Sequence, residues 1–401
     1  MSQSSAVLNA IIIVVALLAG GYLAFSKRLA KSQNWKATVT PLASIMGSGF
    51  LVSAPLLAGV VGNLAVICMA VLLVLAFLLG GVIRFNIKHF EPIEKERGAA
   101  QDVAFLSRIV LVGAYFISVT YYLQLLSAFA LNIAGIDNML AERLLTTGML
   151  TLIGGVGIWR GLDELEKVEK YAVSLNLGMI AALLVGLAVY NIGRVTDGTW
   201  ALPDISSDID LHDLRVLLGL LIVVQGFETS RYLGDTHPAE VRIATMRTAQ
   251  LVSTGIYLVF LALATILFHD GLGSDVTAII SMCKPVAVVL PVLLTVAAIG
   301  SQFSAAVADN SGAGGLIEEI THRKLPVRLA YLLILLVTIA VTWETNVNVI
   351  IAYASRAFAL YYMLQCVVGL LVARKLGKGT VRFAVLAVLC LLVFAFGVPT
   401  G

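Results

Sequence analysis

The chain has very little charge for its length. Only 13% of its 401 residues are Asp, Glu, Lys or Arg, whereas 59% are hydrophobic, and the mean hydropathy is +0.96. A typical soluble domain has about 25% charged residues. The composition therefore excludes a soluble protein and predicts an integral protein of the lipid bilayer. The net charge is only +3 and the basic residues lie between apolar runs, so no nucleic-acid partner is expected.

Cysteine and histidine are also scarce. The four cysteines lie apart, within or beside apolar segments, and form no CxxC pair, which favours free packing residues over disulfides. The five histidines are far apart and fall in expected loops or at span edges, so no metal centre is predicted. The sequence contains no nucleophile elbow, P-loop or HExxH motif. We therefore expect neither an enzyme nor a resident cofactor.

Apolar runs long enough to cross a bilayer recur along the whole chain, separated by short polar connections. A membrane β-barrel would show alternating short strands instead. The sequence therefore predicts an all-α integral membrane protein with twelve transmembrane helices. The expected spans are 6–25, 38–60, 63–84, 102–133, 142–160, 169–191, 213–234, 246–268, 285–308, 326–343, 346–373 and 381–398.

Basic residues alternate between the two expected sides of the membrane. The first run has no basic residue before it and a basic cluster after it, the reverse of a secretory signal, so it is expected to remain as an anchor. Lys and Arg concentrate on cytoplasmic loops. This rule places both termini outside, in a multi-pass protein of the cell (inner or cytoplasmic) membrane. The expected outer side has little more than Arg143, Arg194, Arg215 and Lys284.

The apolar run from about Thr38 to Val60 contains a glycine-rich interruption. In Ser44–Phe50, Gly47 and Gly49 flank Ser48 at the depth where a spanning helix is most buried. Glycine costs roughly 1 kcal/mol relative to alanine in a helix interior and frees the backbone to leave helical geometry. Free backbone groups at mid-membrane are tolerated only beside a cavity or inside protein. The stretch therefore either allows close helix packing or presents its backbone to a small ligand.

A second interruption, within Val224–Ser230, combines a glycine with a charge. Glu228 lies 13 residues beyond Arg215, which is about 20 Å along a helix at roughly 1.5 Å per residue. Lipid exposure there would cost about 2.5–3.5 kcal/mol, so Glu228 is expected to face protein or water. The spans that hold the two interruptions open two consecutive sets of five spans and run in opposite directions. Such paired breaks are typical of an inverted-repeat transporter, which favours the ligand-site interpretation.

These motifs resemble the amino acid–polyamine–organocation (APC) superfamily. Gly47-Ser48-Gly49-Phe50 is similar to the glycine-rich break in the family's first core helix, and Gly226-Phe227-Glu228 to its sixth helix. The loop around His237–Arg242 and the pair Ile256-Tyr257 resemble the connection to the seventh helix and that helix itself. The resemblance covers about residues 38–373, as ten core helices with one extra helix at each end.

The resemblance implies a leucine-transporter-like fold with a 5+5 inverted repeat, in which helices 1 and 6 hold a small zwitterion. Backbone N–H groups at the first break would bind its carboxylate, which suits the positive end of a half-helix. Carbonyl groups at the second break would accept its ammonium group, beside a gate formed by Phe227 and Glu228. The expected substrate-binding residues are Met46, Gly47, Ser48, Gly49, Phe50, Val224, Gln225, Gly226, Phe227, Glu228 and Arg356.

Arg356 is included because it lies near mid-depth of the span 346–373 and needs a partner there. Three roles are open: direct contact with substrate, an ion pair with Glu228, or a structural contact that holds its helix. The first two are compatible with each other.

Coupling-ion residues are expected on helix 8. In sodium-coupled relatives, hydroxyl groups of helix 8 and carbonyl groups of helix 1 bind the cation, and Ser301 and Ser304 match in type. Serine also bonds to the carbonyl groups of its own helix, which is the structural alternative. Proton-coupled relatives have a lysine in helix 5, and the stretch 173–190 has none. The expectation is therefore sodium coupling or proton coupling through Glu228.

The sequence thus predicts three parts: an anchor helix with a basic loop (1–37), a transporter core (38–373, with repeats at about 38–191 and 213–373), and a last helix (374–401). The expected function is secondary active transport of small amino acids or related amines by alternating access, coupled to sodium or protons. The alternative is a non-transporting membrane receptor or complex subunit that retains the fold. A channel is disfavoured because no selectivity ring is recognisable.

Overall fold

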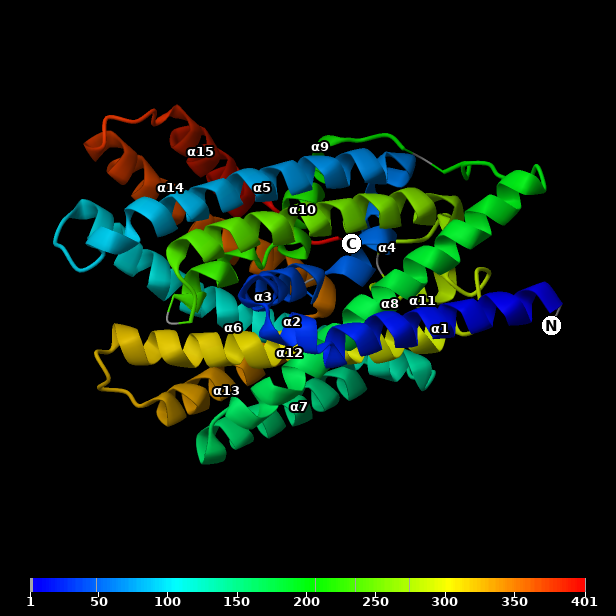
Figure 1. The fold of residues 1–401 in the computed structure, drawn as a ribbon, viewed down its shortest axis with the longest axis horizontal. Helices are drawn as coiled ribbons and strands as arrows, with labels where there is room; N and C mark the ends of the chain where they lie inside the picture. The colour runs from blue at the N-terminus through cyan, green and yellow to red at the C-terminus, as the bar shows by residue number, and fades with distance from the viewer. Residues whose placement is uncertain (1–2, 48, 206, 235, 274, 401) are drawn as a thin grey trace.

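The computed structural model describes residues 3–47, 49–205, 207–234, 236–273 and 275–400, without the side chains of 3–5 and 163–170 (Figure 1). The described residues form helices and contain no strand. The α-helices are α1 (Gln3–Phe25), α2 (Lys27–Lys31), α3 (Gln33–Gly47), α4 (Phe50–Val61), α5 (Ala65–His89), α6 (Ala99–Ile133), α7 (Met139–Arg160), α8 (Asp163–Thr196), α9 (Leu211–Leu218), α10 (Ala239–Ala264), α11 (Ile279–Met282), α12 (Leu290–Ile320), α13 (Val327–Glu344), α14 (Val347–Lys375) and α15 (Val381–Phe396). Short 3₁₀ helices are η1 (Gly62–Leu64), η2 (Glu91–Ile93), η3 (Leu221–Val224), η4 (Phe227–Leu233) and η5 (Thr265–Leu267).

Nine segments of the described chain are long and apolar enough to cross a membrane, by length and composition. One of them, Gln33–His89, contains the second and third predicted spans as one apolar run. The seventh predicted span, 213–234, is divided among α9, η3 and η4, and α15 is an apolar helix of only 16 residues. The all-helical membrane fold is therefore as predicted. Length and composition do not confirm twelve spans, because two predicted spans fall in one run, one is divided and α15 is too short for this criterion.

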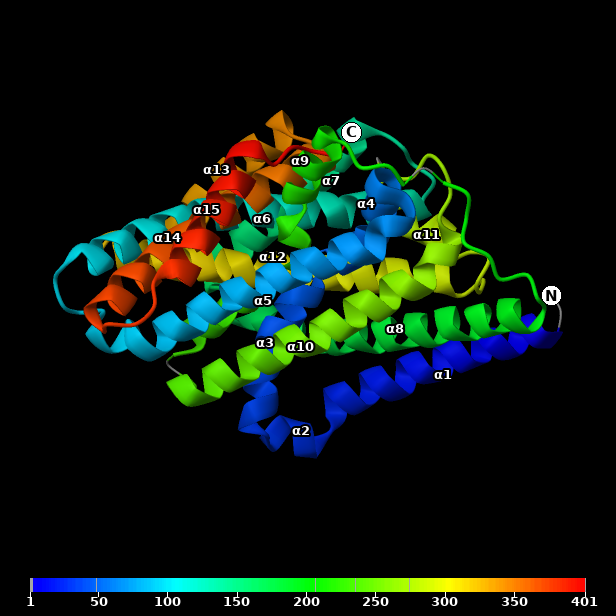
Figure 2. The same cartoon turned by 90° about the horizontal axis from the view of Figure 1, so that it is seen from above.

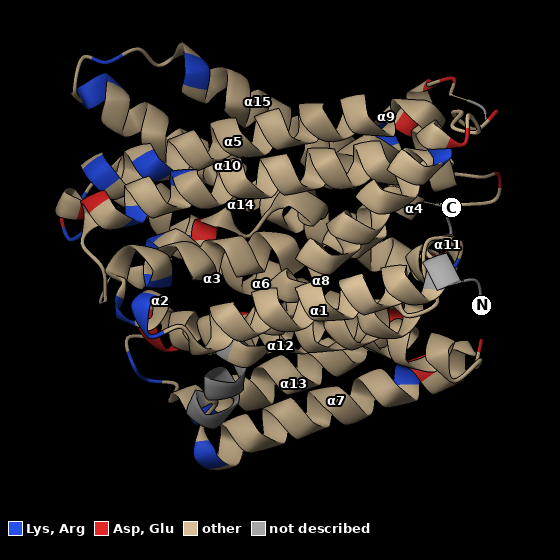
Figure 3. Cartoon of the chain, turned by 45° about the vertical axis from the view of Figure 1, so that its right-hand side comes forward, with Lys and Arg blue, Asp and Glu red and all other residues tan. Residues whose placement is uncertain are grey.

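The long helices lie side by side along the longest axis of the molecule (Figures 1 and 2). Both α12 and α14 pack extensively against α6, so α6 lies at the centre of the bundle. Lys and Arg gather at one end of the bundle, and both termini lie at the opposite end (Figure 3). This charge distribution is the one that the positive-inside rule associates with cytoplasmic loops.

The additional helix α1 packs along α8 (Figure 2). A Cβ atom placed on Gly178 of α8 would lie 2.6 Å from the backbone nitrogen of Gly20 in α1. Because real side chains do not approach that closely, glycine is what allows the two helix backbones to meet at this crossing. Small residues at such crossings are a general feature of helix association in membranes. The described part of 1–37 thus includes a helix attached to the core, followed by α2.

Candidate functional site

The first interrupted segment consists of α3 and α4. The helix α3 ends at Gly47, and α4 begins at Phe50. Ser48, one of the expected substrate residues, lies outside the described residues. Gly49 occupies the N-cap position of α4, and no side chain caps it there. The first backbone N–H groups of any α-helix have no partner inside that helix. The positive end of α4 therefore faces the interruption.

The second interrupted segment changes geometry three times within a few residues. The 3₁₀ helix η3 ends at Val224, Gln225 is extended, and Gly226 has a positive φ of 116° before η4 begins at Phe227. Only glycine adopts that backbone conformation readily. Both interruptions expected from the sequence are therefore present, at the expected positions.

The two interruptions touch each other. A Cβ atom on Gly226 would lie 2.5 Å from the hydroxyl oxygen of Ser44 and 2.7 Å from the backbone nitrogen of Ile45. A Cβ atom on Gly49 would lie 2.7 Å from the Cβ of Val223. Ser44 and Gly226, which are 182 positions apart in the chain (226 − 44), thus lie on segments that meet backbone to backbone, and the glycines make this approach possible.

Side chains from neighbouring helices bond to the backbone groups that the interruptions leave free. The hydroxyl of Tyr257 on α10 lies within hydrogen-bond distance of the carbonyl oxygens of Ile45 (3.2 Å) and Val223. Gln302 Nε2 on α12 donates to the carbonyl oxygen of Gly47 at 2.9 Å. These bonds satisfy carbonyl groups that hydrocarbon could not.

Gln302 also has a buried acceptor. Its side-chain oxygen Oε1 has no hydrogen-bond partner among the described residues, although the residue is only 5% exposed. A buried acceptor left without a donor costs about 1–3 kcal/mol. Because Nε2 of the same amide binds Gly47, this acceptor is close to the first interruption. A ligand N–H group in that place would recover the lost free energy.

Glu228 is 1% exposed and its carboxylate is held by two donors. Oε2 accepts hydrogen bonds from the backbone N–H of Gly226 at 3.0 Å and from the hydroxyl of Tyr362 at 2.6 Å. The Tyr362 ring is stacked on Phe227, with centroids 5.2 Å apart. Glu228 therefore faces protein, as expected from its predicted depth in the membrane. Through Tyr362 it links the second interruption to α14.

Arg356 does not join this arrangement. Its Nε donates to the carbonyl oxygen of Phe394 at 2.7 Å, and its guanidinium lies 5.7 Å from the centroid of the Phe394 ring. Phe394 is near the end of α15, where the last carbonyl groups of a helix have no helical partner. Of the three roles left open by the sequence, the ion pair with Glu228 is therefore not formed in this structure, whereas a structural contact is. Arg356 instead joins α14 to α15, and its contact with substrate stays a prediction.

A small cavity of about 40 Å³ lies beside the interruptions, between α3, α8, η4 and α12. Ser301 and Ser304, expected as coupling-ion residues, both line it, whereas Glu228 does not. Asn176 Nδ2 donates to Ser301 Oγ at 3.3 Å across the cavity wall. A cavity needs roughly 10–15 Å³ to hold one water molecule, so this one has room for water or a single ion. Its polar lining residues are Thr40, Ser44, Asn176, Thr229, Ser301, Ser304 and Asp309.

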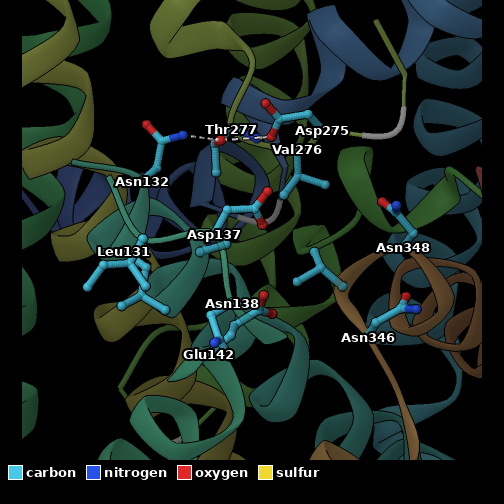
Figure 4. A pocket seen from close by; sticks show the side chains of 13 residues that line it. Leu131, Asn132, Asp137, Asn138, Glu142, Asp275, Val276, Thr277, Asn346 and Asn348 are labelled. Carbon is cyan, nitrogen blue, oxygen red and sulfur yellow. Dashed lines mark hydrogen bonds between the residues drawn. The ribbon is translucent and has the colours of Figure 1, made fainter. Parts of the chain in front are cut away.

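A larger polar cavity of about 430 Å³ lies at the end of the bundle that contains the termini (Figure 4). It contains none of the predicted site residues. Asp137, Glu142 and Asp275 line it, and Asn132 Nδ2 donates to Thr277 Oγ1 at 2.8 Å on its wall. No group of three or more His, Cys, Asp or Glu side chains in the described part of the chain is placed to hold a metal ion.

Several residues that shape the interruptions were not assigned a role from the sequence. Tyr257, Gln302 and Tyr362 hold backbone or carboxylate groups there, and Asn176 and Asp309 line the small cavity. Their common signal is a polar or ionisable side chain inside an apolar span, which marks a polar partner nearby. That signal does not identify the partner.

The chain is similar to known transporters over most of its length. A family model described as APC superfamily transporter matches residues 27–397. The chain is 44% identical to an uncharacterized protein of Aquifex aeolicus (strain VF5) over an alignment of 378 residues. This alignment covers 92% of this chain and 91% of that protein. Crystal structures of two mutants of the Eremococcus coleocola manganese transporter align with a TM-score of 0.57, at 14% and 15% identity, over 91% of this chain and 87% of theirs. At that identity the likeness shows the fold alone.

Proposed function

The chain belongs to the APC superfamily of transporters, and from this premise we propose that it carries small amino acids or related amines across the cell membrane. The observation that carries this proposal is the contact between the two interruptions, where Gly226 meets Ser44 and Ile45. Interrupted helices that meet inside the bundle are how many secondary transporters build a substrate site. The twelve-span topology, the inverted repeat and the outer location of both termini are part of the proposal.

The proposed substrate is an amine because the free groups at the interruptions suit one. The N-terminus of α4, where no side chain caps Gly49, would receive the carboxylate of an amino acid. The unpaired Oε1 of Gln302 would accept a hydrogen bond from its ammonium group, and Phe227 and Glu228 would form the gate of the site. Met46, Gly47, Phe50, Val224 and Gln225 complete the proposed site.

Transition-metal transport is less well supported. The aligned Eremococcus coleocola protein is named a manganese transporter, yet the described residues at the two interruptions include one carboxylate, Glu228, and neither histidine nor cysteine. Mn²⁺ prefers carboxylate, carbonyl and water oxygens as ligands, and the Glu228 carboxylate already accepts hydrogen bonds from the Gly226 N–H and the Tyr362 hydroxyl. The donor set of this chain therefore favours an organic substrate.

Coupling to sodium is proposed at the small cavity. Ser301 and Ser304 present hydroxyl groups from α12, and Ser44 of α3 lines the same cavity. Hard cations prefer such oxygen ligands. Coupling to a proton at Glu228 is the other form of the proposal, and sodium dependence separates the two.

The proposal is tested by thermal unfolding of the purified full chain with a panel of amino acids, amines and Mn²⁺, each with and without sodium. We expect at least one amino acid or amine to raise the unfolding temperature, because a ligand that binds only the folded state stabilises it. Stabilisation by Mn²⁺ alone would overturn the substrate class.

A further inference from the structure

A groove and a basic helix lie together at the end of the bundle opposite the termini. The groove has a volume of about 680 Å³ and lies between α3, α8 and α10, and Leu29 of α2 also lines it. A second hollow of about 260 Å³ adjoins it, and Leu29, Trp35 and Leu177 line both. The two hollows therefore share a wall built around one tryptophan.

The length of the groove matches one leaflet of a membrane. Its lining on α10 extends from Ala244 to Ile256, which is about 18 Å of helix at 1.5 Å per residue. Half of a typical hydrocarbon core is about 15 Å thick. The lining is aliphatic at Leu42, Leu177, Ile180, Leu184, Val252 and Ile256. Its polar residues, Ser32, Asn34, Thr38, Thr245 and Thr248, lie next to α2, at the start of α3 and in the first half of α10. The groove thus has the shape and polarity of a site for an acyl chain.

Four basic side chains belong to α2 and the first turn of α3, the two helices whose Leu29 and Trp35 line both hollows. Lys27, Arg28, Lys31 and Lys36 are all exposed, and Lys36 lines the smaller hollow. No acidic side chain among the described ones forms an ion pair with any of the four. Figure 3 shows α2 at the end of the bundle where the other Lys and Arg residues gather. Basic residues directly beside a membrane-spanning helix attract anionic lipids.

We propose that the two hollows bind an anionic phospholipid of the cytoplasmic leaflet. Its phosphate faces the four basic side chains and its two acyl chains occupy the two hollows, on either side of Trp35. Tryptophan is favoured at this depth because its ring is apolar and its N–H is polar. The assignment of the cytoplasmic leaflet rests on the orientation given under the proposed function, whereas the lipid site itself does not require transport.

The site also has a consequence for the interrupted segment. Thr38 and Leu42 on the groove wall belong to α3, which continues into the first interruption at Gly47. A lipid in the groove therefore packs against the inner half of this segment and must be accommodated when α3 moves. If the lipid binds more tightly to one position of α3 than to another, lipid binding shifts α3 toward the preferred position.

The test measures lipid binding without transport. The purified, delipidated full chain is titrated in detergent with phosphatidylglycerol or phosphatidylcholine, and binding is followed by native mass spectrometry. We expect phosphatidylglycerol to bind at least tenfold more tightly. Because each basic residue near a surface contributes about 1 kcal/mol, the double variant Lys31→Gln/Lys36→Gln should weaken phosphatidylglycerol binding by roughly tenfold or more. Binding of phosphatidylcholine should not change.

Matched controls separate this site from general attraction to a basic surface. Arg374→Gln/Lys375→Gln removes two exposed charges at the end of α14 and should leave both lipids unaffected. Ala181→Trp fills the groove and should weaken both lipids, whereas Ala340→Trp, on the exposed face of α13, should not. If Ala181→Trp does not fold, Ala244→Trp at the exposed rim replaces it.

Equal affinity for the two lipids would overturn the proposal, as would equal effects of the two charge variants or full binding by the groove-filling variant. None of these results depends on which solute the protein transports. A failure of the lipid site is therefore distinguishable from a failure of the proposed function.

Discussion

Gly226 lies so close to Ser44 that a single added carbon atom would come within 2.5 Å of the Ser44 hydroxyl oxygen. The two residues belong to the two interrupted segments, and Gly226 has a positive φ of 116°. The contact therefore depends on glycine in two ways, through backbone conformation and through space. It joins the two interrupted segments at the place where the substrate is proposed to bind.

Gly226→Ala should abolish transport and destabilise the fold. A left-handed conformation costs about 1–2 kcal/mol for a non-glycine residue, and the new Cβ would also press on Ser44 and Ile45. Uptake into proteoliposomes and thermal unfolding measure the two effects. Gly255→Ala on α10 is the control, because nothing lies within 4 Å of its added Cβ. Normal uptake by Gly226→Ala would show that the contact is dispensable.

Gly219→Ala should release residues 397–400 from the part of the second interrupted segment that follows α9. A Cβ atom there would lie 2.2 Å from the carbonyl oxygen of Val398, whose N–H donates to the carbonyl oxygen of Arg215 at 3.1 Å. We expect a cysteine placed at Val398 to react faster with a thiol reagent in this background. Gly113→Ala, with open space around its Cβ, serves as the matched background. Equal reaction rates in the two backgrounds would contradict the packing described.

Glu228→Gln should remove ion-driven accumulation while the protein still folds. The amide retains an oxygen that accepts hydrogen bonds from Gly226 N–H and the Tyr362 hydroxyl, the two donors that hold the carboxylate. What is lost is the charge. The measurement is accumulation of labelled substrate against a gradient, compared with simple exchange, at several pH values. Unchanged accumulation at every pH would exclude Glu228 from coupling.

Arg231 should matter more for stability than its acidic partner. Its side chain is 6% exposed, and it lies 3.5 Å from Glu94 while donating to Gln365 Oε1 at 2.6 Å. Arg231→Gln breaks both contacts in a buried setting, for which we expect a loss of about 2–3 kcal/mol. Glu94→Gln should cost below about 1 kcal/mol because that side chain is 32% exposed. Thermal unfolding ranks the two variants, and the reverse order would refute this account.

The positions of both interruptions could be predicted from the sequence because a glycine within an apolar span weakens the helix at its own position. The same holds for the burial of Glu228, which follows from its depth alone. The side chains that fill the space around the interruptions could not be predicted in this way. Tyr257 reaches Ile45 across 212 positions of the chain, and such a contact is set by how α10 packs against α3.

Arg356 shows why depth is an incomplete guide. Its position within an apolar span required a polar partner, and the carboxylate of Glu228 at similar depth was a reasonable candidate. Depth does not say which way a side chain points around its helix. In the structure it points to α15, where the free carbonyl group of Phe394 serves as partner. A free backbone carbonyl group can be the partner of a buried arginine, as a carboxylate can, and depth in the span does not distinguish the two.

The most direct test of the central claim is counterflow of labelled amino acids and amines in proteoliposomes that contain the wild-type chain or Gly49→Trp. The wild type should exchange at least one of these solutes with saturation. Gly49→Trp should not, because the space beside Gly49 is already occupied by Val223 and a large side chain would force the interruptions apart. Undiminished counterflow in Gly49→Trp would place the substrate elsewhere and contradict the account.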